Sequence, residues 1–297
     1  MAFAGCRDAL GRTVARDDFE GASAILVCGV SAWALGRASA LGAPFLGTGN
    51  LAMPKAAIFD LDGTLLDSVD LHALAWQEAM VEFGHDVTFE QARSQIGKGG
   101  DKLIPVFLSE AEQRDHGKTL DEWRGKRFKS AYLPLVRPFS AVPDLLRRAR
   151  GAGLRIAIAS SAKKDELEKY LAIAGIVDLV DIATSSEDVD ESKPAPDIFE
   201  VVLEKLGIEG GAAVAIGDTP YDSIAAGKVG IPTIGVLCGG FTESSLRDAG
   251  CVDVYPGPAT LYARFDDTPL ADKTTAGSLA IPAAAARWRR GSVRKKL

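Results

Sequence analysis

The chain has 297 residues, of which 47% are apolar and 25% are charged, a balance typical of a globular protein that can bury a large core. Its net charge of -6 argues against a general nucleic-acid binder, because such a protein needs a basic surface to neutralise phosphates. The four cysteines form no CxxC pair and have no histidine cluster beside them. We therefore expect neither a zinc site nor a disulfide framework, and a reducing cytoplasm is the simplest location.

The first 52 residues differ in character from those that follow. Their apolar run at residues 23–35 is too short to span a membrane, and the acidic residues before it do not suit a secretory signal peptide. Met53 begins a stretch typical of the first strand of a domain. We expect residues 1–52 to be an extension outside the fold, or even the product of an upstream start codon, and we expect no membrane partner.

The sequence AAIFDLDGTLLDS, residues 56–68, places two carboxylates at the end of an apolar strand. Asp60 and Asp62 lie on either side of one leucine and the chain turns at Gly63, so both side chains can face one crevice. Such close carboxylates repel each other unless a cation lies between them or one holds a proton. With Mg²⁺, which prefers oxygen ligands, Asp60 could be ligand and nucleophile while Asp62 carries a proton.

Residues 68–137 contain no comparable strand, and their pattern predicts helices at residues 71–84, 89–97 and 119–133. Seventy residues are too many for a loop between a strand and a helix, so we expect an inserted helical cap domain. Ligands of open parallel sheets bind beyond the carboxyl ends of the strands. A cap in that position would close over the chemistry and exclude water.

Further apolar runs have the length and continuous apolarity of strands buried on both faces, at residues 154–160, 180–185, 212–218 and 232–237. Amphipathic helices are predicted among them, at residues 142–154 and 196–208. This alternation predicts βαβ units, a parallel sheet and hence an α/β fold. We expect residues 53–67 and 138–265 to form the core domain.

Polar residues follow several of these strands. Ser160 stands where a hydroxyl could hold a phosphate oxygen, although a serine there is usually only a helix cap. Lys193, on the approach to a helix, could neutralise both the nucleophile and the phosphoryl oxygens, although a lone lysine is most often solvated. Asp218 suits a Mg²⁺ ligand and Asp222 an acceptor for metal-bound water or for Lys193, although both could simply satisfy the first turn of a helix.

The composition changes again at the carboxyl end. The chain closes with a basic segment, and the sequence shows no internal repeat. We expect residues 266–297 to be a solvated, flexible tail rather than a nucleic-acid or membrane anchor.

The order and setting of these residues resemble the four motifs of the haloacid dehalogenase (HAD) superfamily. The motifs are Asp60-Leu61-Asp62-Gly63-Thr64, Ser160, Lys193, and Gly217-Asp218 through Asp222, and the similarity covers about residues 55 to 265. The resemblance implies a Rossmann-like parallel sheet of order 5-4-1-2-3, with the strands that end in Asp60 and Asp218 side by side. It also implies that Asp60 forms an aspartyl-phosphate, while Asp62 protonates the leaving group and then activates water.

Within the superfamily, the position of the cap resembles that of the subgroup with phosphoglycolate phosphatase and β-phosphoglucomutase. Dehalogenases lack the second aspartate, which favours phosphate chemistry here. The helix with His72 and Trp76 is similar to the start of such caps, although a core role for Trp76 is at least as consistent. The loop at residues 96–103 is similar to one that carries an arginine for a distal phosphate in the mutases. No arginine is present in it, so Lys98 and Lys102 are the candidates for an anionic substrate tail, and a mutase is less expected.

The sequence therefore predicts a Mg²⁺-dependent phosphatase that hydrolyses a small phosphomonoester, such as phosphoglycolate or a sugar phosphate, as a monomer or homodimer. The expected site residues are, for catalysis, Asp60, Asp62, Ser160 and Lys193; for the metal, Asp60, Asp62 and Asp218, with Asp222 behind them; and for the substrate, Thr64, Ser161, Lys98, Lys102 and His72. The alternatives are a β-phosphoglucomutase-like mutase and a binding or regulatory protein that keeps the fold without catalysis.

Overall fold

Six parallel strands form the central sheet in the computed structural model, which describes residues 53–271. In spatial order they are β5 (Ile182–Thr184), β4 (Arg155–Ala159), β1 (Ala56–Phe59), β6 (Ala213–Gly217), β7 (Thr233–Val236) and β8 (Asp253–Tyr255). Phe59 pairs with Ile158 on one side and with Ile216 on the other, so the carboxyl ends of the three central strands lie level. The predicted extension, residues 1–52, and residues 272–297 lie outside the described residues.

The predicted sheet order is confirmed, with one addition. If the core strands β1, β4, β5, β6 and β7 are numbered 1 to 5 along the chain, their order from β7 to β5 is 5-4-1-2-3. The sixth strand, β8, extends the sheet beside β7. The sequence did not predict β8, because its three residues are of mixed polarity and only Tyr255 is buried. An α/β Rossmann-like fold is therefore established for the described part of the chain.

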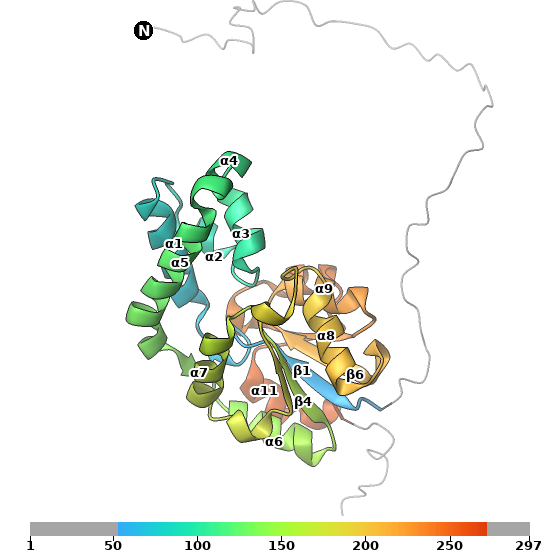
Figure 1. Cartoon of the computed structure of the whole chain (residues 1–297). Coiled ribbons are helices and arrows are strands. Elements are labelled where there is room, and N and C mark those ends of the chain that lie inside the picture. Colours follow the sequence, from blue (N-terminus) through green and yellow to red (C-terminus); the bar gives the residue numbers. More distant parts are fainter. Residues whose placement is uncertain (1–52, 272–297) are drawn as a thin grey trace, which may run out of the picture. The chain divides into compact units, whose positions relative to one another are not determined.

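Helices cover both faces of the sheet, which is why its central strand is apolar throughout (Figure 1). Ala57 and Phe59 belong to one hydrophobic cluster, and Ala56 and Ile58 to the other, as expected from the alternation of side chains along a strand. The first cluster includes residues of α6 (Val142–Gly151), α7 (Lys164–Ala174) and α11 (Pro258–Ala263). The second includes residues of α8 (Asp197–Leu206) and α9 (Pro220–Lys228).

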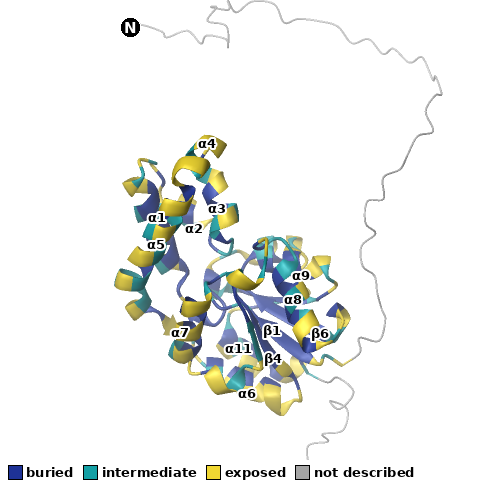
Figure 2. Ribbon diagram, in the orientation of Figure 1, coloured by how far each residue is buried: buried dark blue, intermediate teal, exposed yellow. Residues whose placement is uncertain are grey.

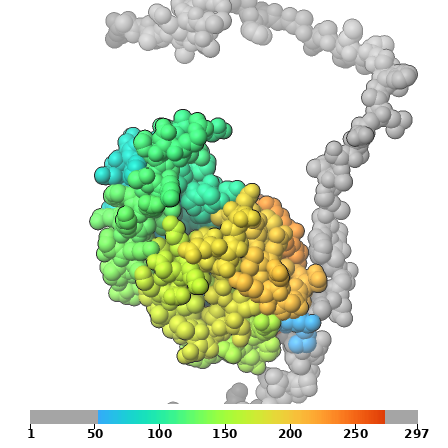
Figure 3. All heavy atoms as spheres, in the orientation of Figure 1, coloured from blue at the N-terminus to red at the C-terminus, as the bar shows by residue number. Residues whose placement is uncertain are grey.

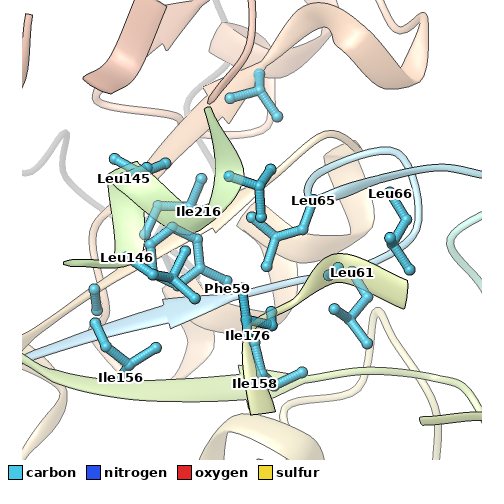
Figure 4. Close-up of a cluster of buried hydrophobic side chains, with 14 of the residues drawn as sticks. Phe59, Leu61, Leu65, Leu66, Leu145, Leu146, Ile156, Ile158, Ile176 and Ile216 are labelled. Carbon is cyan, nitrogen blue, oxygen red and sulfur yellow. The ribbon is translucent and has the colours of Figure 1, made fainter. Parts of the chain in front are cut away.

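The first of these clusters is the larger core (Figure 4). Phe59 lies there among aliphatic side chains of the neighbouring strands and of α6, and all of these are buried. In Figure 2 the central strands β1 and β6 are accordingly dark blue, and exposed residues lie on the outer sides of the helices. Burial of this kind supplies most of the driving force for folding and holds the strand ends in register.

Residues 68–137, which we call the insertion, are helical and lie between two short paired strands. The strands are β2 (Leu66–Asp67) and β3 (Arg137–Pro138), which pair antiparallel. The helices are α1 (Val69–Glu82), α2 (Phe89–Arg93), α3 (Gly100–Phe107), α4 (Glu110–Glu112) and α5 (Lys118–Arg127), with π-helical turns at Gln113–Gly117 and Phe128–Tyr132. The insertion has a hydrophobic cluster of its own, which includes Trp76, Met80, Leu103 and Leu120.

The core continues beyond residue 265, where the tail was expected to begin. Thr268 and Leu270 are buried, and Leu270 is part of the larger hydrophobic cluster. The predicted boundary is thus too early, because an apolar side chain in a polar segment still packs on the core.

One further helix, α10 (Glu243–Asp248), lies between β7 and β8 in the chain. Within residues 53–271, every helix is too short or too polar to cross a lipid bilayer.

Candidate active site

Three carboxylates meet at the carboxyl ends of β1 and β6. Asp60 directly follows β1 and Asp218 directly follows β6, and these strands are neighbours in the sheet. Asp222 lies in the first turn of α9, where its Oδ2 accepts hydrogen bonds from the amide and hydroxyl of Thr219 at 3.1 and 2.7 Å. Each of the three carboxylates offers an oxygen within 4.8 Å of the others, so they could share one cation.

Lys193 supplies the positive charge of this cluster. Its side chain is only 2% exposed, and its Nζ lies 2.6 Å from Asp60 Oδ1 and 2.7 Å from Asp222 Oδ1. The first contact is a hydrogen bond, whereas the second is an ion pair without hydrogen-bond alignment. Nζ also donates to the carbonyl oxygen of Ala159 at 2.8 Å. The ammonium thus lies between Asp60 and Asp222. The sequence predicted Lys193 beside Asp60, with Asp222 as a possible acceptor for it.

The cluster carries more negative than positive charge. Burial, together with Asp222 and Asp62, raises the pKa of Asp60 to about 7, although Lys193 opposes this shift. Burial and the neighbouring Asp60 and Asp222 raise the pKa of Asp218 well above its usual value. Asp218 Oδ2 is buried and has no hydrogen-bond partner among residues 53–271. An orphaned carboxylate oxygen beside two other carboxylates fits a hard divalent cation such as Mg²⁺.

Two glycines allow Asp218 to lie where it does. Gly63 has a positive φ of 81°, and a Cβ added to it would lie 2.3 Å from Asp218 Oδ2. At Gly239, a Cβ would lie only 1.7 Å from the same oxygen. Thr64 Oγ1 donates to Asp218 Oδ1 at 2.9 Å. Thr64 is completely buried and does not line the cavity, so it orients Asp218 instead of binding the substrate as predicted.

Asp62 lies outside the group of three carboxylates. Its Oδ1 accepts hydrogen bonds from Ser68 Oγ at 2.5 Å and from His72 Nε2 at 3.1 Å. Although burial opposes it, these contacts hold the pKa of Asp62 below its usual value. The two aspartates of the motif therefore have pKa values shifted in opposite directions, which is typical of carboxylates with different roles. The Asp62 side chain is thus held by Ser68 and His72, and it is not part of the group of three carboxylates that could share a cation.

His72 links this aspartate to the insertion. Its Nε2 lies 3.1 Å from the hydroxyl of Tyr170, and its ring stacks on Phe128 with 4.0 Å between centroids. His72 also lines the cavity beside Asp62. The sequence suggested a contact between His72 and the substrate, and the structure shows a contact between His72 and Asp62.

A cavity of about 460 Å³ lies over the carboxylates, between the core and the insertion. Asp60, Asp62 and Ser161 line it from the core, and Trp76 and Lys98 line it from the insertion. In Figure 3 the insertion runs from cyan to green, and the core residues beside it are mainly yellow.

Ser160, Ser161 and Lys102 were all predicted to contact the substrate, but only Ser161 lines the cavity. Ser160 is completely buried outside the cavity wall, and its Oγ accepts a hydrogen bond from the Ala162 amide at 3.1 Å. The direct phosphate contact expected of Ser160 is therefore not seen, because the chain turns after the strand and presents Ser161. Lys102 was also placed wrongly: it pairs with Glu191 at 2.8 Å and does not line the cavity.

Lys98 does line the cavity, but it is already engaged. Its Nζ donates to Gln95 Oε1 at 2.6 Å and lies 5.0 Å from the centre of the Tyr221 ring. Burial lowers the pKa of Lys98, which remains well suited to carry a positive charge toward the cavity.

The insertion is tied to the loop that precedes Lys193. The Gly99 amide donates to Ser192 Oγ at 3.1 Å, and the Ser192 amide donates to Asp101 Oδ2 at 3.2 Å. These contacts join residues more than ninety positions apart in the chain. Sequence reasoning missed Ser192 and Asp101, because neither has a local pattern that distinguishes it from an ordinary loop residue.

Comparisons with known proteins agree with this geometry. Residues 57–236 match the family model described as haloacid dehalogenase-like hydrolase. Phosphoglycolate phosphatase from Aquifex aeolicus (strain VF5) is 28% identical over 190 residues, which are 62% of this chain and 85% of that protein. A phosphorylated carbohydrates phosphatase from Thermotoga maritima is 25% identical over 199 residues, 67% of this chain and 92% of that protein. The crystal structure of a hydrolase from Pseudomonas syringae matches with a TM-score of 0.68 and 26% identity, over 73% of this chain and all of that one.

The site thus consists of clustered carboxylates and the buried Lys193 at the strand ends of a parallel sheet. This arrangement agrees with the hydrolase family that the comparisons identify. Since the family model matches more than half of the chain, the protein belongs to the haloacid dehalogenase-like hydrolase family. The predicted superfamily is confirmed, as is the similarity to the subgroup that contains phosphoglycolate phosphatase.

Proposed function

We propose that the protein is a Mg²⁺-dependent phosphatase that hydrolyses a small phosphomonoester through an aspartyl-phosphate on Asp60. The observation that carries this proposal is the buried Lys193 ammonium between Asp60 and Asp222, with Asp218 beside them. Phosphoryl transfer depends on an aligned nucleophile and on fixed positive charge around the transferred group. The relatives that are phosphatases support the same reaction. A cytoplasmic location and a monomer or homodimer stay predictions.

Asp60, Asp218 and Asp222 would hold the Mg²⁺ ion. When bound, the ion supplies positive charge that neutralises the phosphoryl oxygens and relieves the repulsion among these carboxylates. The raised pKa values of Asp60 and Asp218 report that repulsion. Asp218 Oδ2, which is buried without a partner in the described residues, is an oxygen that such an ion would satisfy.

Asp60 is the nucleophile of the first step. Lys193 holds its Oδ1, and no hydrogen bond from residues 53–271 reaches Oδ2, which is therefore the oxygen available to attack phosphorus. The new bond joins Oδ2 to phosphorus while the bond from phosphorus to the alcohol oxygen breaks. Asp62 gives a proton to that oxygen, and the Ser161 residue, which lines the cavity beside Asp60, would stabilise the phosphoryl oxygens. The Lys193 ammonium on Asp60 Oδ1 adds positive charge beside the nucleophile.

Asp62 serves as the base of the second step. Water attacks the phosphorus of the aspartyl-phosphate, Asp62 takes a proton from this water, and Asp60 leaves as a free carboxylate. The hydrogen bonds from Ser68 and His72 orient Asp62 and favour its ionised form, which suits this role. The proton taken here is the one that the next leaving group receives.

Phosphate release from a panel of phosphomonoesters, with Mg²⁺ and with EDTA, tests the proposal. We expect Mg²⁺-dependent release by the wild type, and a loss of more than about 10³-fold in Asp60→Asn, which removes the nucleophile. Asp86→Asn, an exposed loop position in the insertion, is the matched control and should keep full activity. Release that persists in Asp60→Asn would refute the covalent route. Isomerisation of glucose 1-phosphate with a bisphosphate primer, without hydrolysis, would favour a mutase, and no turnover of any ester would favour a non-catalytic protein.

A further inference from the structure

The cavity has a second group of charged side chains, which come from α5 and from Lys163. Asp121 of α5 accepts hydrogen bonds from Arg124 Nη2 at 3.1 Å and from Lys163 Nζ at 3.0 Å, so one carboxylate faces two cations. Burial opposes the shift, but these two cations lower the pKa of Asp121, which therefore stays ionised. Lys118, one turn before Asp121 on the same helix, also lines the cavity and has no ion-pair partner among the described residues. Three cations, Lys118, Arg124 and Lys163, thus line the cavity together with the carboxylates of Asp121 and Glu166, and Glu166 has its own partner in Lys129 at 3.6 Å.

Arg124 also has an unused hydrogen-bond donor. Its side chain is only 12% exposed, and its Nε is buried without a hydrogen-bond partner in residues 53–271. Buried nitrogen donors are nearly always paired, because a buried donor loses its hydrogen bond to water and an unpaired one gains no bond in exchange. Arg124 lines the cavity, so a ligand that fills the cavity can supply the missing acceptor.

The guanidinium is also fixed in orientation before any ligand arrives. One nitrogen is held by Asp121, and the centre of the group lies 4.7 Å from the Trp76 ring, in cation–π geometry. A guanidinium is planar and presents its donors as a rigid fork, which matches the paired oxygens of a carboxylate or a phosphate. A neutral hydroxyl group would use only part of this fork.

We propose that Arg124 binds a second anionic group of the substrate, a carboxylate or a phosphate, remote from the phosphoryl group that Asp60 accepts. Lys118 and Lys163 add positive charge around this group, and Asp121 positions Arg124. The inference rests on the proposed function and names its substrate class: phosphomonoesters with a second acidic group, in preference to neutral sugar phosphates.

Steady-state kinetics on three kinds of ester test this inference. The first is a phosphorylated hydroxy acid, the second a sugar bisphosphate, and the third a hexose monophosphate with an uncharged tail. The wild type is expected to prefer the first or the second over the third by about 10-fold or more in kcat/KM, and the better of these two identifies the anion as carboxylate or phosphate. A wild type that hydrolyses the neutral ester equally well overturns the inference without any variant.

Variants of Arg124 then assign the preference to this side chain. Arg124→Met should reduce the ratio of kcat/KM for the acidic ester to that for the neutral ester by about 10-fold, mainly through KM, and Arg124→Lys should restore part of it. Arg127→Met is the matched control on the same helix, since Arg127 pairs with Glu78 and does not line the cavity. It should leave the ratio unchanged.

The two proposals fail in distinguishable ways. An unchanged ratio in folded Arg124→Met, or an equal loss in Arg127→Met, would refute the role of Arg124 while the phosphatase stands. Absence of Mg²⁺-dependent hydrolysis of all three esters by the wild type would refute the proposed function itself.

Discussion

Replacing Lys193 by methionine removes the one ammonium that pairs with both Asp60 and Asp222, while it keeps a side chain of similar length. The contacts at 2.6 and 2.7 Å involve a lysine that is 2% exposed, so water cannot replace the lost charge easily. Removing one partner of a buried ion pair typically costs about 3–5 kcal/mol, because an uncompensated charge stays behind. We expect the free energy of unfolding of metal-free Lys193→Met to fall by about that amount near pH 8.

The loss should depend on pH. Burial already raises the pKa of Asp60 to about 7 with Lys193 present, and loss of the lysine removes an interaction that lowers this pKa. Near pH 5.5 the carboxylates can therefore take up protons in place of the lost ammonium, and the destabilisation should be smaller than near pH 8. Urea unfolding followed by circular dichroism at both pH values measures the difference.

Lys205→Met is the control for this experiment. Lys205 is on α8 and pairs with Asp188 at 3.2 Å, but both side chains are more than a third exposed. An exposed pair contributes little, so this variant should lose less than about 1 kcal/mol. Equal losses in the two variants, or a loss in Lys193→Met that does not change with pH, would show that the cluster is not held by this lysine.

Three further predictions concern the metal site and its supports. The pKa of Asp60 is raised to about 7, so the stability that Asp60 contributes without metal is present near pH 4 and is lost as the pH rises to about 7. Mg²⁺ should therefore raise Tm more near pH 8 than near pH 5.5. Ser192→Ala removes the acceptor of the Gly99 amide, and steady-state kinetics should show kcat/KM lower by about 5-fold or more. Gly239→Ala places a Cβ 1.7 Å from Asp218 Oδ2, so Asp218 must move; both Mg²⁺-dependent turnover and the shift of Tm by Mg²⁺ should be lost.

Each of these predictions has its own control. Mg²⁺ that raises Tm equally at both pH values would mean that the ion does not compete with protons on the carboxylates. Ser130→Ala, where the hydroxyl donates only within its own helix, should leave kcat/KM unchanged, and a loss as large as that of Ser192→Ala would exclude a specific role for Ser192. Gly125→Ala, with open space around the added Cβ, should raise stability by about 0.5–1 kcal/mol, and Gly239→Ala with normal Mg²⁺ response would contradict the packing of Asp218.

The parts of the fold that could be predicted are those that local pattern determines. The five strands that the sequence predicted are short apolar runs, and residues that directly follow such strands gather at one edge of a parallel sheet. This reasoning correctly places Asp60 and Asp218 side by side, whereas Lys193 lies on the approach to α8, away from any strand end in the chain. The strand at Asp253–Tyr255 was not predicted, because its three residues are of mixed polarity and do not form a continuous apolar run.

The parts that could not be predicted depend on contacts between distant segments or on the direction of a single side chain. Whether Ser160 or Ser161 faces the cavity depends on one backbone turn. Lys102 and Arg124 are both basic residues of the insertion, and only the folded structure shows that Glu191 engages the first while the second lines the cavity. The loop at 96–103 thus contributes Lys98 to the cavity but not Lys102, and Arg124 lies outside that loop, on α5.

The most direct test of the central claim is to trap the phosphoryl group on Asp60. A rapid acid quench during turnover of a phosphomonoester with Mg²⁺, followed by mass spectrometry of the peptide that contains residues 56–68, should detect one added phosphoryl group in the wild type. The same peptide from Asp60→Asn should carry none. Turnover without any phosphorylated peptide, or phosphorylation that persists in Asp60→Asn, would contradict the account.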